Sequence, residues 1–307
     1  MLSKRVAKTC GQIKALEIQG ARKIAKAAVQ SMAQQADDSD AETKDALMSD
    51  LLVAADELAK TRPTEPMLQN SLRFLFAELQ KEKPKTAAAL KKAVKREEKE
   101  LLVKFEKNAS LIADYGAREI PEGASVLIHC HSNTVMGALK KAQELGKNPK
   151  VICTETRPRF QGRLSAKELS EAGLDVTMIV DSGAKYAMKE FDVDVVLVGG
   201  DAVSSTGDLI NKIGTSQIAS CAYEQNIKMF SCIELYKFDP LTMWGKVTEI
   251  EERDPSEIAD QKKFKGVRIW NPAFDRTPAK YLTGYITEKG IVSPQGLLNL
   301  AIREFKL

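Results

Sequence analysis

Reactive and charged side chains follow several short apolar runs in the second half of the sequence, at the point where each run ends. Four of them stand after four different runs: Cys130, Arg157, Asp201 and Lys237. Because the carboxyl ends of parallel strands meet at one edge of a sheet, these side chains would converge if the runs are parallel strands. A thiol, a carboxylate and two cations in one place could bind a small anionic substrate and move its protons.

Cys130 and Asp201 are the candidates for acid–base chemistry. A thiol at the positive end of a helix has its pKa lowered and becomes a usable base or nucleophile. A carboxylate among apolar residues can hold its proton near neutral pH and act as an acid. Each position taken alone has a plainer interpretation, which is a buried inert thiol for Cys130 and a capping or turn aspartate for Asp201.

Five polar residues nearby could hold a phosphorylated sugar: Ser132, Asn133, Thr134, Asn211 and Lys212. The first three are typical helix N-cap residues, and the backbone N–H groups at a helix start bind phosphate. Capping is their alternative role, and it is compatible with phosphate binding. Asn211 and Lys212 offer an amide and a cation, and their alternative is an ordinary polar cluster at a helix start.

The histidines that flank Cys130 do not indicate a metal centre. His129 and His131 would point away from Cys130 in an extended strand, and adjacent residues rarely supply convergent ligands. The five cysteines are odd in number and form no CxxC pair, which argues against a zinc site and against a disulfide framework. We therefore expect no metal.

The spacing of apolar residues differs between the two parts of the chain. Residues 1–115 predict a helical domain, since apolar residues such as Leu47, Leu51 and Leu58 recur at helical spacing. Residues 116–307 predict an α/β domain with a mostly parallel sheet, because apolar runs alternate with helical patterns. The expected strands are 125–129, 151–154, 175–180, 193–198, 228–233 and 267–270, and the expected helices are 135–145, 166–172, 184–189 and 209–223.

Composition excludes several classes of protein. The net charge of +4 is too small to indicate a nucleic-acid partner, although it fits an anionic substrate. No apolar run approaches the roughly 18–20 residues of a membrane span, and the N-terminal stretch lacks a signal-peptide core. We expect a cytoplasmic protein that binds neither nucleic acid nor membrane.

Several blocks together resemble one family. Residues 154–162, TETRPRFQG, resemble the ETRPxxQG signature of the family that includes the alpha, beta and delta subunits of initiation factor 2B, methylthioribose-1-phosphate isomerases and ribose-1,5-bisphosphate isomerases. Residues 199–203 resemble its GAD segment with Gly200 in place of the usual Ala, and residues 207–215 resemble its NGxxxNKIGT segment. The resemblance implies a helical N-terminal domain followed by a Rossmann-like domain, assembled as dimers or dimer-built hexamers.

The sequence HCHS at residues 129–132 looks like the bisphosphate isomerase branch. The resemblance implies that the chain converts ribose 1,5-bisphosphate to ribulose 1,5-bisphosphate during nucleoside monophosphate degradation, without a cofactor, and it makes AMP a candidate activator. The resemblance implies Cys130 as base and Asp201 as acid, with a substrate-binding set of Gly20, Ala21, Arg22, Lys23, Arg62, Ser132, Asn133, Thr134, Asn211, Lys212 and Lys237.

Other interpretations stay open. Read without the family, Arg22 and Lys23 are surface charges, and Glu155 and Arg157 form a buried pair or a subunit contact. The alternative functions are a non-catalytic regulatory subunit related to initiation factor 2B and a methylthioribose-1-phosphate isomerase.

Overall fold

The computed structural model describes residues 2–305, and the chain forms two compact units whose boundary lies between Lys107 and Asn108. The expected boundary, after residue 115, falls within the same long helix, α5 (Ala87–Glu119). Each unit is described by itself.

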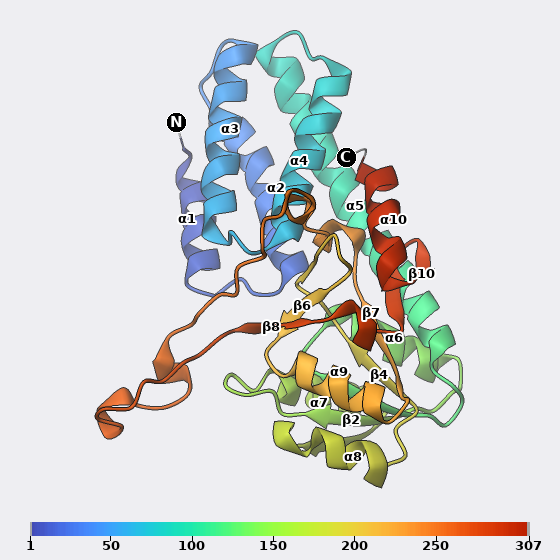
Figure 1. Cartoon of the computed structure of the whole chain (residues 1–307). Helices are drawn as coiled ribbons and strands as arrows, with labels where there is room; N and C mark the ends of the chain where they lie inside the picture. Colours follow the sequence, from blue (N-terminus) through green and yellow to red (C-terminus); the bar gives the residue numbers. More distant parts are fainter. Residues whose placement is uncertain (1, 306–307) are drawn as a thin grey trace. The chain divides into compact units, whose positions relative to one another are not determined.

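The first unit is made of helices. It contains α1 (Lys4–Lys14), α2 (Ala21–Asp38), α3 (Lys44–Thr61), α4 (Pro66–Glu82) and the first part of α5 (Figure 1). Hydroxyl side chains cap the N-termini of α1 and α3. The Ser3 hydroxyl accepts from the Val6 amide, and the Thr43 hydroxyl accepts from the Ala46 amide. Apolar residues three or four apart are buried along α3, as the helical spacing predicts.

The second unit is built on a seven-stranded sheet with the strand order β10-β9-β7-β4-β1-β2-β3 (Figure 1). The strands are β1 (Ser125–His129), β2 (Lys150–Thr154), β3 (Asp175–Ile179), β4 (Val195–Val198), β7 (Lys228–Cys232), β9 (Gly284–Thr287) and β10 (Gly290–Val292). Every neighbouring pair is parallel except β9 and β10. The predicted fold class, a helical region followed by an α/β domain with a mostly parallel sheet, is confirmed.

Helices cover both faces of this sheet. On one face, α6 (Asn133–Glu144), α7 (Gln161–Glu171) and the end of α5 pack on Val126 and Ile128. On the other, α8 (Ala184–Glu190), α9 (Thr215–Glu224) and α10 (Leu297–Phe305) pack in the cluster that contains Leu127. Successive residues of β1 therefore face opposite cores, which explains why its sequence is continuously apolar.

A smaller antiparallel sheet corrects one prediction. It contains β5 (Ala202–Val203), β6 (Leu209–Lys212) and β8 (Phe274–Thr277), in the order β5-β6-β8. The expected helix 209–223 is wrong in its first part, because residues 209–212 pair with β8. The helix begins only after Gly214, whose φ of 102° suits glycine and no other residue well.

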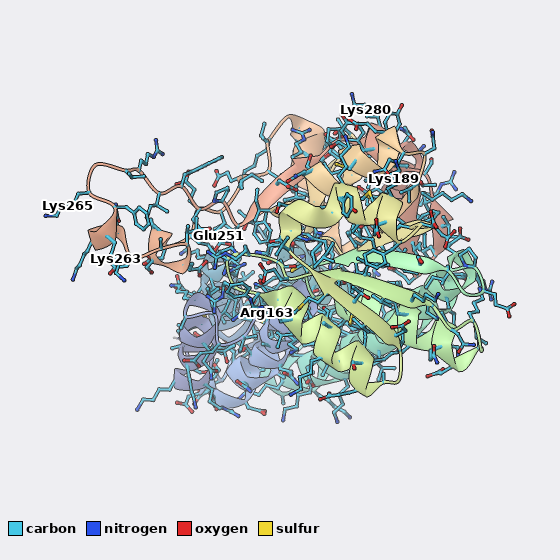
Figure 2. The ribbon with its side chains drawn as sticks, turned by 90° about the horizontal axis from the view of Figure 1, so that it is seen from below. Arg163, Lys189, Glu251, Lys263, Lys265 and Lys280 are labelled. Carbon is cyan, nitrogen blue, oxygen red and sulfur yellow. The ribbon has the colours of Figure 1, made fainter. Side chains whose placement is uncertain are left out.

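The expected strand 267–270 is also wrong. It lies in the long segment 245–273 between the short 3-10 helix η3 (Pro240–Trp244) and β8, and Val267 and Trp270 are exposed. An apolar run forms a strand only where another strand offers hydrogen bonds, and here none lies beside it among the described residues. Figure 2 shows Lys263 and Lys265 at the tip of the loop that this segment forms, away from the large sheet.

Further 3-10 turns connect the elements: η1 (Asp181–Gly183), η2 (Leu235–Lys237), η4 (Pro255–Glu257), η5 (Gln261–Lys263), η6 (Ala279–Tyr281) and η7 (Pro294–Gly296). Across residues 2–305, no helix combines the length and apolarity that crossing a membrane requires.

Candidate active site

The carboxyl ends of β1, β2, β4 and β7 lie along one edge of the large sheet, as predicted. Cys130 follows β1, Asp201 follows β4 after two glycines, and Lys237 lies in the η2 turn that follows β7. The Lys237 ammonium donates to the Gly200 carbonyl, next to Asp201. Asp201 also acts electrostatically on the Cys130 thiol. The sheet thus brings these three residues together.

Cys130 does not continue the strand. Its φ is 66°, its amide donates to the Thr156 hydroxyl at 2.9 Å, and its carbonyl accepts from the Ser165 hydroxyl at 3.1 Å. The chain turns in the left-handed region at this residue, so the strand alternation assumed for residues 129–131 ends at His129. The backbone of Cys130 is held by hydrogen bonds on both sides, which fixes the direction of its Cα–Cβ bond.

The expected lowering of the Cys130 pKa is wrong. Desolvation raises the pKa of the thiol to about 11, while the charge of Lys212 opposes that rise and the charge of Asp201 adds to it. The helix that was expected to lower the pKa, α6, starts three residues further on, at Asn133. At neutral pH the thiol therefore carries its proton.

His129 links β1 to the loop before α9. Its Nε2 lies 2.8 Å from the Ile213 carbonyl, so this nitrogen carries the proton and donates it. Its Nδ1 then accepts from the Thr154 hydroxyl at 2.7 Å. Burial lowers the pKa of His129, which keeps the ring neutral. Among residues 2–305, no three His, Cys, Asp or Glu side chains are grouped to hold a metal ion.

The start of α6 packs closely against the end of β4. A Cβ added to Gly199 would lie 2.6 Å from the Ser132 hydroxyl oxygen, so only glycine fits there. The Thr134 hydroxyl donates to the Cys232 carbonyl at 2.7 Å, and the Ser132 hydroxyl therefore donates to Thr134. The side chain of Thr134 is buried and bonded to β7, while Asn133 is exposed.

Asn211 and Lys212 lie on strand β6, so the alternative of a polar cluster at a helix start is wrong. Lys212 is 7% exposed, donates to the Ala273 carbonyl at 3.0 Å, and has its ammonium 5.0 Å from the centre of the Phe274 ring. The Asn211 amide donates to the Thr215 hydroxyl at 3.0 Å. A buried ammonium with one neutral acceptor is able to bind an anion strongly.

Asp275 is a residue whose role the sequence did not reveal. It pairs with Asn211 across β6 and β8, and its carboxylate accepts from the amides of Gly214 at 2.7 Å and Ser216 at 3.1 Å. Burial raises its pKa to about 6, although these two bonds and Lys212 oppose the rise. The carboxylate caps the N-terminus of α9 from a strand that is distant in sequence.

The loop after β2 contains Glu155 and Arg157. They do not form the buried pair that was one alternative, because each binds another residue of the second unit. Glu155 binds Arg163 at 2.8 Å, and the Arg157 guanidinium donates to the Ile258 carbonyl at 3.2 Å. Asp181 holds the loop, since its carboxylate accepts from the Thr156 and Arg157 amides. The contacts of Glu155 and Arg157 therefore help to fix the loop after β2.

Five residues of the predicted substrate-binding set belong to the first unit. Gly20 is the N-cap of α2 with a φ of 87°, and Ala21, Arg22 and Lys23 form the first turn of this helix. Lys23 is exposed, whereas Arg62 is buried and lies 3.3 Å from the Glu65 carboxylate. Their role in substrate binding stays a prediction.

Comparison with known proteins places this geometry in a family. The ribose 1,5-bisphosphate isomerase of Methanocaldococcus jannaschii is 41% identical over 292 residues, which covers 95% of this chain and 92% of that protein. A Pyrococcus horikoshii structure described as translation initiation factor eIF-2B superposes with a TM-score of 0.82 at 31% identity, covering 95% of this chain and 98% of that one.

The 5-methylthioribose 1-phosphate isomerase of the same organism superposes with a TM-score of 0.79 at 30% identity, covering 98% of this chain and 87% of that one. The sequence profile described as the initiation factor 2 subunit family matches residues 17–294. The resemblance seen in the sequence is therefore confirmed, and the chain belongs to the initiation factor 2 subunit family.

Proposed function

We propose that this chain isomerises α-D-ribose 1,5-bisphosphate to D-ribulose 1,5-bisphosphate. The observation that carries the proposal is the convergence of Cys130, Asp201 and Lys237 at one edge of the large sheet, with Lys212 of β6 close enough to act on the Cys130 thiol. The relative at 41% identity that bears the name of this activity favours it over the two alternative functions. A thiol and a carboxylate suit proton transfer, and the two buried ammonium groups suit a substrate with two phosphates.

The reaction requires four proton transfers, two to form an enol and two to convert the enol to the product. The phosphate on C1 prevents the ring from opening as a free hemiacetal does. An acid must protonate the ring oxygen as its bond to C1 breaks, while a base removes the proton from C2. The resulting enol then takes a proton at C1 and loses the proton of its C2 hydroxyl, which leaves the ketone at C2.

The raised pKa of Cys130 changes which residue we propose as the acid and which as the base. A thiol that carries its proton at neutral pH is suited to protonate the ring oxygen. The carboxylate of Asp201 is then the group that accepts the C2 proton. This assignment reverses the one expected from the sequence, in which the thiol was the base.

Several residues would hold the substrate. In the second unit, Lys212 and Lys237 would bind phosphate, and the start of α6 at Ser132 and Asn133 offers backbone N–H groups. In the first unit, we propose Lys23 and Arg62 as further phosphate ligands. We also propose that the protein acts as a homo-oligomer, a dimer or a hexamer, and that AMP activates it, as the family resemblance implies.

The direct test is turnover. We would incubate the purified protein with α-ribose 1,5-bisphosphate, with and without AMP, and follow ribulose 1,5-bisphosphate through coupled carboxylation. Cys130→Ala and Asp201→Asn should each lower kcat by about 10²–10⁴. Cys221→Ala, which removes a partly buried thiol from α9, is the matched control and should keep its turnover.

Other results would redirect the assignment. Absence of turnover under both conditions would favour the regulatory interpretation. Faster turnover of methylthioribose 1-phosphate would favour the other isomerase branch. The pH profile of kcat tests whether Cys130 is the acid or the base. A thiol that acts as acid makes kcat fall at high pH, whereas a thiol that acts as base makes kcat rise.

A further inference from the structure

A pair of buried carboxyl groups lies at the same sheet edge and has no part in the proton transfers described above. Glu234 follows β7 and is 1% exposed, and Glu288 follows β9 and is 6% exposed. β7 and β9 are neighbouring parallel strands, so the two residues leave the sheet side by side. Buried acidic side chains are rare because their desolvation costs free energy, and each one calls for a reason.

Glu288 holds the turn that carries Lys237. Its carboxylate accepts a hydrogen bond from the Leu235 amide at 3.1 Å, at the first residue of η2. Within this turn the Lys237 amide donates to the Glu234 carbonyl at 3.0 Å. The Lys237 side chain then reaches the Gly200 carbonyl, one residue before Asp201.

Burial and the neighbouring charges make the ionised form of Glu288 destabilising for the fold. Burial raises the pKa of Glu288 to about 7, and the charges of Glu234 and Glu304 add to the rise. Lys289, the next residue, pairs with Glu304 at 2.7 Å. The amides of Glu288 and Leu235 favour the ionised form but do not cancel the effect of burial. An apolar side chain at position 288 would avoid this cost.

Other contacts hold the turn without a charge. Tyr236 packs edge-on against Phe305 of α10 with ring centres 5.4 Å apart, and Leu235 and Phe238 lie in the core cluster with Leu297. These apolar contacts fix the turn against the core. The peptide unit between Glu234 and Leu235 is oriented at both ends by hydrogen bonds, because its carbonyl accepts from the Lys237 amide and its N–H donates to the carboxylate of Glu288.

We propose that Glu288 is a positioning residue, which orients the η2 turn so that the Lys237 ammonium lies beside Asp201. The inference rests on the proposed function insofar as Lys237 binds substrate phosphate there. Glu288 does not touch the substrate in this proposal. It acts through the η2 turn and Lys237, and this role explains why a carboxyl group is buried there.

Two variants separate placement from stability. Glu288→Gln keeps an oxygen that accepts from the Leu235 amide, whereas Glu288→Leu has a similar size and no acceptor. The matched control is Glu304→Gln, which changes a partly exposed carboxylate of the same neighbourhood. We expect Glu288→Leu to raise KM about tenfold with a smaller change in kcat, and both Gln variants to stay within about threefold of the native chain.

A double-mutant cycle shows whether the effect passes through Lys237. Adding Glu288→Leu to Lys237→Met should change KM little further, since the cation to be placed is already absent. Fully additive effects of the two substitutions would overturn the proposal.

A second measurement does not depend on turnover. Acetylation of lysines by acetic anhydride, resolved by mass spectrometry, should label Lys237 several-fold faster in Glu288→Leu and leave the buried Lys212 unchanged. Equal labelling of Lys237 in the native chain and in Glu288→Leu would overturn the positioning role. If the native chain shows no turnover but the labelling responds as expected, the proposed function fails while the positioning of Lys237 stands.

Discussion

The ionisation state of Cys130 gives the sharpest test of the proposed chemistry. Desolvation raises the pKa of this thiol from 9.0 to about 11. Two pKa units correspond to about 2.7 kcal/mol between the protonation states. At pH 8 the thiolate fraction is then about one in a thousand, compared with about one in ten for the unshifted thiol, so alkylation should be roughly 100-fold slower.

Alkylation by iodoacetamide, resolved by mass spectrometry between pH 7 and pH 10, measures this difference. The thiol is partly buried, which also restricts access, but access does not depend on pH, so the slope of the rate against pH isolates ionisation. We expect the Cys130 rate to rise about tenfold per pH unit without a plateau up to pH 10. Lys212→Met should lower the rate further, because the lysine charge favours the thiolate.

A plateau below about pH 8 would refute the reasoning. Such a plateau would mean that the thiol is already ionised at neutral pH. Cys130 would then be the base, as the sequence first indicated. The Cys130→Ala variant supplies the background of labelling at the four other cysteines.

Three other substitutions have defined outcomes. Glu288→Gln should raise the free energy of unfolding by up to about 3 kcal/mol at pH 8 but not at pH 4.5, because a pKa raised from 4.5 to about 7 makes ionisation destabilising as pH rises through this range. Denaturant unfolding at both pH values measures it, and an equal effect at both would contradict it. Gly162→Ala should prevent folding or cost more than about 3 kcal/mol, since its Cβ would lie 1.7 Å from the Thr154 carbonyl oxygen, whereas Gly11→Ala on α1 meets no atom within 4 Å and should be harmless in the same assay. Thr134→Val should lower stability by about 1–2 kcal/mol, because its hydroxyl binds a β7 carbonyl, and should leave KM unchanged if that hydroxyl does not touch substrate.

The sequence predicts the strand ends well, because buried parallel strands impose a strong pattern. A run of apolar residues such as 126–128 must be covered on both faces, and few other structures explain it. The polar residue that follows then has to lie at the sheet edge. The sequence therefore suffices to place Cys130, Asp201 and Lys237 at one edge of the sheet.

The antiparallel sheet could not be predicted in this way. Residues 209–212 lie just before α9 in the sequence, and they form a strand because they pair with β5 on one side and with β8, more than sixty residues away, on the other. The capping of α9 by Asp275 has the same origin. The pKa of Cys130 was mispredicted for a related reason, since desolvation depends on every segment that surrounds the thiol and not on the neighbouring helix alone.

The distribution of buried charge supports the placement of the site independently of any motif. In the described part of the second unit, four Asp, Glu, Lys or Arg residues are buried: Lys212, Glu234, Lys237 and Glu288. Three of them follow the carboxyl ends of β7 and β9, and the fourth ends β6, close enough to act on the Cys130 thiol. Each costs free energy that an apolar residue would not. Because these costs collect after β7 and β9 and at the end of β6, around the proposed site, they are better explained by the binding of an anionic substrate than by the needs of folding: the two lysines would bind it, and Glu288 would position one of them.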